Sequence, residues 1–217
     1  MNHVHQGQPV LILGDSSPTA SRAVILLHGR GATADSMRAL SEAIGVDGTR
    51  HYIPQAASNR WYPQTAFGPT AVNEPDLSSA LNIVGELYDT ALQDGFERGK
   101  IFLGGFSQGA CLAAEYLVRN PDQIGGLFIL SGALIGPPDQ PRNPVGDLRG
   151  TPVFIGGSDV DPWVEEPLFH QAARVFSGLG AQVDLKIYPG MGHTINADEI
   201  TRIRGLLTST NPQQPGI

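Results

Sequence analysis

The 217-residue sequence contains a single cysteine, Cys111, so no disulfide can form within the chain. It contains no apolar run close to the ~20 residues that a membrane-spanning helix needs. Its first nine residues also lack the charged and apolar regions of a signal peptide. These absences predict a cytoplasmic protein, in a reducing compartment, without stable insertion into a membrane.

Basic residues are few. The chain has 14 Lys and Arg residues against 21 Asp and Glu residues, which gives a formal net charge of −7, and no basic cluster stands out. This balance disfavours nucleic acid or an anionic membrane as the main partner. No Cys/His cluster has the spacing of metal ligands, and His3 and His5 are interpreted as part of a solvated terminus. We therefore expect neither a metal nor an organic cofactor.

The composition is otherwise that of a globular protein, with 41% apolar and 16% charged residues. A chain of this length can bury one sizeable core, so we predict a single domain over residues 1–217. About eight residues at the start, 1–8, and the last residues, 209–217, are expected to be loose. The 27 glycines and 17 prolines indicate many tight loops, where functional sites are usually built.

Apolar strand patterns alternate with helical periods along the chain. The predicted strands cover residues 10–14, 22–27, 50–54, 101–103, 126–131, 152–155 and 182–188, and the predicted helices cover about 36–44, 76–94, 110–118, 163–179 and 196–207. This alternation predicts an α/β fold, a mostly parallel twisted sheet with helices on both faces. Ligands of such sheets bind at the C-terminal ends of the strands.

The segment Gly105-Phe106-Ser107-Gln108-Gly109 has the pattern G-x-S-x-G between a predicted strand and a predicted helix. A serine on such a tight turn is held in a strained backbone conformation, and the glycines allow neighbouring backbone to pass closely. The N–H of Gln108 then lies at a helix N-terminus, which favours developing negative charge. Ser107 is therefore the candidate nucleophile.

A serine hydroxyl needs a base and a group that orients the base. Two histidines follow Ser107, and His170 falls in the middle of a predicted helix. His193 lies in Gly190-Met-Gly-His, between the last strand and the last helix, and is the favoured base. Asp159 and Asp161 both follow the strand at 152–155, and spacing alone does not choose between them as the triad acid.

A second glycine-containing loop, His28-Gly-Arg-Gly, follows the buried strand at 22–27. Glycines at this position allow backbone N–H groups to turn toward a ligand. Together with Ser107, the loop is the natural second half of an oxyanion hole, in which the N–H of Arg30 faces that of Gln108.

The segment 55–75 has no regular period but is rich in aromatic residues, and a loop of this length is uncommon unless it is functional. An ordinary packed surface loop is the alternative. The candidate walls of an apolar substrate pocket are Trp61, Tyr62, Phe67, Leu134, Ile135 and Trp163.

Four motifs together resemble the carboxylesterase/lysophospholipase branch of the α/β-hydrolases, which also contains the acyl-protein thioesterases. They are His28-Gly-Arg-Gly, Gly105-Phe-Ser-Gln-Gly, Ser158-Asp-Val-Asp-Pro and Gly190-Met-Gly-His, in the family's order. The resemblance implies the α/β-hydrolase fold without a large cap domain. It also implies the triad Ser107, His193 and Asp161, with Asp161 chosen because Asp161-Pro-Trp-Val matches the family's Asp-Pro-x-Val segment.

The resemblance implies a serine carboxylic-ester hydrolase that acts through an acyl-enzyme on small to medium acyl or aromatic esters, with lysophospholipids and thioesters as further candidates. Two positions depart from the family pattern: Glu165 replaces a proline, and Arg30 stands where the acyl-protein thioesterases have an apolar residue. The second departure weakens the inference that the chain removes lipids from proteins. The expected partner is a small-molecule ester, and the chain is expected to be a monomer or a homodimer.

Three alternatives remain to be weighed. The first is a dienelactone-hydrolase-like enzyme, which resembles this pattern but has a cysteine nucleophile on the strand-to-helix turn, where this chain has Ser107. Cys111 lies four residues further on and is more simply explained as a small buried residue. A catalytically silent hydrolase fold used for binding would lack a triad member, and none is missing. A dinucleotide-binding domain needs G-x-G-x-x-G, and Gly29-Arg30-Gly31 lacks the third glycine.

Overall fold

The structure is a computed structural model that describes residues 3–16, 19–138, 140–142 and 144–209. In this part of the chain seven strands form one sheet in the order β1-β3-β2-β4-β5-β6-β7. The strands are β1 (Val10–Gly14), β2 (Arg22–Leu27), β3 (Thr49–Pro54), β4 (Ile101–Phe106), β5 (Gly126–Leu130), β6 (Pro152–Ser158) and β7 (Gln182–Tyr188). Strand β1 pairs antiparallel with β3, and the other strand pairs are parallel.

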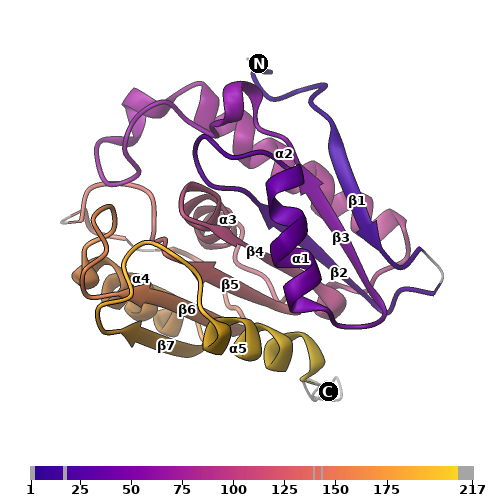
Figure 1. The fold of residues 1–217 in the computed structure, drawn as a ribbon. Helices are drawn as coiled ribbons and strands as arrows, with labels where there is room; N and C mark the ends of the chain where they lie inside the picture. Colours follow the sequence, from indigo (N-terminus) through magenta and orange to yellow (C-terminus); the bar gives the residue numbers. More distant parts are fainter. Residues whose placement is uncertain (1–2, 17–18, 139, 143, 210–217) are drawn as a thin grey trace.

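Five α-helices cover the two faces of the sheet. They are α1 (Arg38–Ile44), α2 (Asp76–Gln93), α3 (Gln108–Arg119), α4 (Glu166–Gly178) and α5 (Ala197–Thr208). Helices α1 and α5 pack on one face, which is the near face in Figure 1, and α2, α3 and α4 pack on the other. The fold is therefore the α/β sandwich that the strand and helix alternation predicts, and the expected fold class is confirmed.

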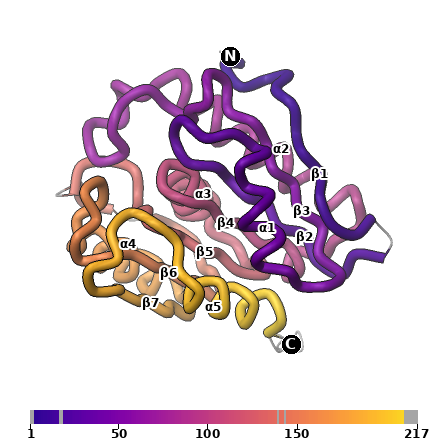
Figure 2. The backbone as a smooth tube through the Cα atoms, in the orientation of Figure 1, coloured from indigo at the N-terminus to yellow at the C-terminus, as the bar shows by residue number. Residues whose placement is uncertain are grey.

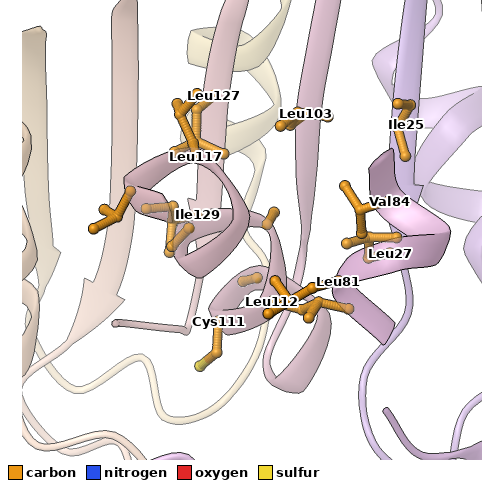
Figure 3. Close-up of a cluster of buried hydrophobic side chains, with 14 of the residues drawn as sticks. Ile25, Leu27, Leu81, Val84, Leu103, Cys111, Leu112, Leu117, Leu127 and Ile129 are labelled. Atoms are coloured by element: carbon orange, nitrogen blue, oxygen red, sulfur yellow. The ribbon is translucent and has the colours of Figure 1, made fainter. Parts of the chain in front are cut away.

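The larger apolar core lies between the sheet and helices α2, α3 and α4. Figure 3 shows side chains of α2 and α3, such as Val84 and Leu112, against Ile25, Leu103 and Ile129 of three neighbouring strands. Strands β2, β4 and β5 are buried along almost their whole length, because helices cover both of their faces. These central strands form the rigid base of the site described below.

The strand order reverses between β2 and β4, because β3 lies on one side of β2 and β4 on the other. Open α/β sheets bind ligands in the crevice at such a switch point. The loops that follow β2, β4, β6 and β7 gather at this C-terminal edge, and the chain trace in Figure 2 shows them at one end of the molecule. All four motifs from the sequence lie in these loops.

Several predicted boundaries differ from the structure, and two of these differences affect the site directly. Strand β4 extends to Phe106, three residues beyond the predicted end, because its pairing with β5 continues to Leu130. Helix α4 begins at Glu166 rather than near Trp163. The Asp161 carboxylate accepts hydrogen bonds from the backbone N–H groups of Trp163 and Val164, which holds these two residues in a turn before the helix.

The N-terminal segment is more ordered than expected. Residues 1–8 were predicted to be loose, but His5 is buried, and its backbone N–H donates to the Ser79 hydroxyl at 3.0 Å. Most of the predicted loose C-terminus, residues 210–217, lies outside the described residues. In the described part of the chain, no helix is both long and apolar enough to cross a membrane.

Candidate active site

Ser107 lies between the end of β4 and the start of α3, with φ 55° and ψ −120°. Gly105 and Gly109 flank it, and a Cβ atom at either position would collide with the Leu27 carbonyl on the neighbouring strand β2. The two glycines therefore allow the turn to pass close to β2, which is the steric reason for the G-x-S-x-G pattern. The turn places the Ser107 hydroxyl at the C-terminal edge of the sheet.

His193 connects Ser107 to Asp161 through two hydrogen bonds. Its Nε2 lies 2.9 Å from Ser107 Oγ, and its Nδ1 lies 2.7 Å from Asp161 Oδ2. A neutral imidazole that donates from Nδ1 to the carboxylate presents Nε2 as an acceptor to the serine hydroxyl. The arrangement can thus withdraw a proton from Ser107 and hold the resulting positive charge beside Asp161.

The structure separates the two aspartates that the sequence left open. The Asp161 side chain is fully buried, and its second oxygen accepts the N–H groups of Trp163 at 2.8 Å and Val164 at 3.1 Å. Asp159 instead accepts the N–H of Gly190 at 2.7 Å, in the loop that carries His193. Asp161 therefore contacts the histidine ring, and Asp159 braces the loop around it.

His170, the other histidine after Ser107, lies on α4 with its side chain half exposed, 3.3 Å from Glu166 one helical turn earlier. It takes no part in the hydrogen-bond chain to Ser107. Phe106, which sequence reasoning did not single out, packs its ring 4.9 Å from the ring of His193. The only sequence signal for Phe106 is its position directly before the serine.

The loop after β2 lies directly against the turn that carries Ser107. A Cβ atom on Gly29 would lie 3.4 Å from Ser107 Cβ and from the Phe106 ring, so the loop packs closely there. Gly31 has a positive φ of 76°, which favours glycine. Arg30 and Gln108 both line the cavity above Ser107. The assignment of their backbone N–H groups to an oxyanion hole stays a prediction.

The side chain of Gln108 joins the aromatic loop to the serine turn. Its Oε1 accepts the backbone N–H of Trp61 at 2.9 Å, and its Nε2 donates to the carbonyl of Tyr62 at 2.8 Å. The Arg30 guanidinium donates to the carbonyl of Pro63, which lies on the same aromatic loop, at 2.8 Å. The pocket wall is thus fastened to both halves of the predicted oxyanion hole.

Two buried histidines contact this loop on the side that faces the core. His28 accepts the N–H of Ala56 on Nε2 at 3.1 Å, and His5 accepts the N–H of Ala57 on Nδ1 at 3.1 Å. Both rings pack against Trp61, with ring centroids at 4.9 Å and 5.6 Å. Burial lowers the pKa of both histidines. The interpretation of His5 as part of a solvated terminus is therefore wrong.

A cavity of about 540 Å³ opens above Ser107. Three of the predicted wall residues line it: Tyr62, Phe67 and Trp163. Trp61 does not, because its indole is turned into the core, where Nε1–H donates to the His28 carbonyl at 2.8 Å. Leu134 and Ile135 do not line the cavity either, because both are buried in the core on the α2–α4 side of the sheet. The prediction of Trp61 and Leu134 as pocket walls is wrong.

Cys111 lines the same cavity, one helical turn after Ser107. It is buried, as the sequence predicts, and burial raises the pKa of its thiol to about 11. Its sulfur accepts the N–H of Ala133 at 3.3 Å, and in Figure 3 it lies at the lower end of the apolar cluster. An uncharged thiol in this position provides a small apolar surface rather than a nucleophile.

Among the residues that the structure describes, no group of three or more His, Cys, Asp or Glu side chains could hold a metal ion.

The chain is similar to known hydrolases in both sequence and structure. A sequence profile described as Phospholipase/Carboxylesterase matches residues 12–211. An acyl-protein thioesterase 1 of Kluyveromyces lactis is 27% identical over 201 residues, which cover 83% of this chain and 88% of the relative. A probable carboxylesterase of Oryza sativa subsp. japonica is 26% identical over 214 residues, 89% of this chain and 90% of the relative.

A crystal structure of a phospholipase/carboxylesterase from Dyadobacter fermentans superposes with a TM-score of 0.89. The two chains are 36% identical, and the alignment covers 94% of this chain and 97% of the Dyadobacter fermentans chain. The profile match, the relatives and the shared fold confirm the resemblance drawn from the four motifs. The chain belongs to the phospholipase/carboxylesterase family of the α/β-hydrolases and is a hydrolase of the carboxylesterase type.

Proposed function

We propose that the protein hydrolyses carboxylic esters through an acyl-enzyme on Ser107, with His193 as general base and Asp161 as the acid of the triad. The observation that carries this proposal is the continuous hydrogen-bond chain from Ser107 Oγ through both ring nitrogens of His193 to Asp161, at 2.9 Å and 2.7 Å. The positive φ of Ser107 supports it, because a strained serine at a helix N-terminus is typical of a nucleophile.

In the first half of the reaction His193 Nε2 takes the hydroxyl proton while Ser107 Oγ attacks the ester carbonyl carbon. The tetrahedral intermediate collapses when the bond to the alcohol oxygen breaks, and His193 gives its proton to that oxygen. Water then attacks the acyl-enzyme with His193 again as base, and Ser107 leaves with the proton. Asp161 stabilises the imidazolium in both halves.

The oxyanion would be held by the backbone N–H groups of Arg30, in the loop after β2, and Gln108, at the start of α3, and both residues line the cavity. The N–H of Gln108 opens helix α3, where the helix dipole favours negative charge. Loss of one such donor typically costs about 3–4 kcal/mol of transition-state stabilisation. The side-chain bonds of Arg30 and Gln108 to residues 61–63 hold both donors in place.

The cavity favours small to medium acyl or aromatic esters. Its inner wall is formed by Tyr62 and Cys111, both almost fully buried, and Phe67 and Trp163 add aromatic surface nearer the solvent. A volume of about 540 Å³ lies within the usual range for small-molecule sites. Lysophospholipids and thioesters use the same chemistry and remain candidate substrates, since relatives carry the name acyl-protein thioesterase.

The test is hydrolysis of p-nitrophenyl esters of increasing acyl length by the wild type and by Ser107→Ala. We expect the variant to lose about 10⁶-fold in kcat, the order found when the serine of a triad is removed. Mass spectrometry should also show one phosphonate adduct per chain, on Ser107, after treatment with a fluorophosphonate. Wild-type turnover that survives in Ser107→Ala would contradict the proposal.

A further inference from the structure

A second apolar cavity, which we call the α1–α5 groove, lies between helices α1 and α5. Its volume is about 490 Å³. The two helices contact each other on the near face of the sheet in Figure 1. The side chains along the groove are Met37, Ala39, Leu40, Ile195, Ala197 and Ile200.

The groove adjoins the active-site cavity. Gly29, Ala32 and Phe106 line both of them and form the boundary between the two spaces. Phe106 directly precedes the nucleophile, and Gly29 packs on the Ser107 turn. A substrate bound at Ser107 therefore has two directions in which to extend, toward the inner wall at Tyr62 and Cys111 or over Phe106 into the groove.

The direction of proton transfer assigns the two parts of an ester to these two spaces. The alcohol oxygen must receive its proton from His193 Nε2, so the alcohol lies on the His193 side of the intermediate. The ring of His193 contacts Phe106 at 4.9 Å between centroids, and Ile195, two residues after His193, lines the groove. Tyr62 and Cys111 line only the active-site cavity, which leaves that space for the acyl group.

The walls of the groove are held by contacts at both of its ends. Arg204 of α5 donates from Nε to the carbonyl of Ile44 at 3.0 Å, and also to the carbonyl of Ala43, which lines the groove. At the other end the Asn196 side chain caps α5 by accepting the N–H groups of Asp198 and Glu199. The groove is therefore a preformed feature of the helix pair.

We infer that the α1–α5 groove binds the alkyl chain of the leaving alcohol, and that the preferred substrates are esters of uncharged aliphatic alcohols. No charged side chain is among the described residues that line the groove, and its surface is mainly aliphatic. An extended alkyl chain matches such a surface through burial of apolar area. This inference rests on the proposed ester hydrolysis at Ser107.

The test compares two isomeric esters, hexyl acetate and ethyl hexanoate, which share one molecular formula but carry the long chain on opposite sides of the carbonyl. We expect Ala39→Trp, on α1, and Ala197→Trp, on α5, to lower the ratio of kcat/KM for hexyl acetate to that for ethyl hexanoate at least tenfold. Both alanines are exposed, so the added ring fills the groove without entering the core. Glu42→Trp, an exposed α1 position outside the groove, is the matched control and should keep the wild-type ratio.

An unchanged ratio in both groove variants would overturn the inference, and so would a selective loss of ethyl hexanoate turnover, which would place the acyl chain in the groove. Only the activity that depends on Ser107, which is the turnover that Ser107→Ala abolishes, is used for this comparison. Absence of Ser107-dependent turnover would overturn the proposed function as well, so the two failures are distinguishable. Thermal unfolding of each variant, followed by circular dichroism, checks that the fold is retained.

Discussion

The side-chain oxygen of Gln108 accepts a hydrogen bond from the backbone N–H of Trp61 at 2.9 Å, although the two residues are 47 positions apart in the sequence. Through this bond and the one to the Tyr62 carbonyl, the residue that follows the nucleophile also fixes the aromatic wall of the pocket. One side chain thus couples the position of the proposed oxyanion donor at Gln108 to the shape of the proposed acyl site.

Replacement of Gln108 by Ala should therefore reduce both stability and activity. The variant leaves a buried N–H and a buried carbonyl without their partner, at a cost of about 1–3 kcal/mol each. We expect urea unfolding to show a loss of about 2–6 kcal/mol, together with a higher KM for p-nitrophenyl esters. Gln64→Ala, an exposed glutamine in the same wall, should change stability by less than about 0.5 kcal/mol. Equal effects of the two variants would show that the amide does not brace the wall.

The two aspartates of the β6 loop give a second prediction. Asp161→Asn should lower kcat by about 10⁴-fold, because an amide at this position no longer fixes the productive tautomer of His193. Asp159→Asn should lower kcat by less than about tenfold, since Asp159 braces the backbone of Gly190 without contact to the ring. Steady-state kinetics on one p-nitrophenyl ester compares the two. A larger loss in Asp159→Asn would assign the triad acid to Asp159.

Glu199 should make the protein less stable as the pH rises. It is fully buried, Oε1 has no hydrogen-bond partner among the described residues, and burial raises the pKa of the carboxyl to about 7. In the unfolded chain the carboxyl has its ordinary pKa of about 4.5, so stability falls from pH 4.5 to pH 7 and then levels off. Between pH 5 and pH 8 the loss is about 2–3 kcal/mol.

In Glu199→Gln this loss should disappear, because the amide does not ionise and can still accept the N–H of Asn196. The measurement is urea unfolding of both proteins at pH 5 and at pH 8. A stability difference between variant and wild type that is the same at the two pH values would contradict the prediction.

His51 should act in the opposite direction. It lies in β3 between Leu13 of β1 and Val24 of β2, with neither ring nitrogen hydrogen-bonded to a described residue. Burial lowers the pKa of its imidazole to about 4, from 6.5. The unfolded chain therefore takes up a proton first as the pH falls, and stability decreases from about pH 6.5 down to pH 4.

Between pH 7 and pH 5 this contribution amounts to about 2 kcal/mol. His51→Leu removes it, so the variant should gain stability relative to the wild type by that amount over the same interval. Thermal unfolding at pH 7, 6 and 5 checks the trend. A constant difference between the two proteins would show that His51 does not titrate in this range.

The sequence by itself determined the fold class and the position of the candidate nucleophile. Period-two and period-3.6 patterns define the strands and helices through local side-chain geometry, and Gly105 and Gly109 around Ser107 mark a turn that only small residues allow. The placement of the motifs at the ends of parallel strands also brought His193 and the pair Asp159 and Asp161 into the prediction, because the C-terminal ends of those strands meet at one edge. The choice of Asp161 came from the resemblance to the family.

Only the tertiary structure decided which residues touch the substrate space. Trp61 and Tyr62 are neighbours in one aromatic loop, yet one faces the core and the other the cavity, because the indole N–H of Trp61 is bonded to His28 behind the wall. The burial of His5 and the groove between α1 and α5 likewise depend on contacts between segments far apart in the chain. Local sequence patterns report periodicity and turn chemistry, whereas the direction of a side chain within a loop is set by partners that the pattern does not contain.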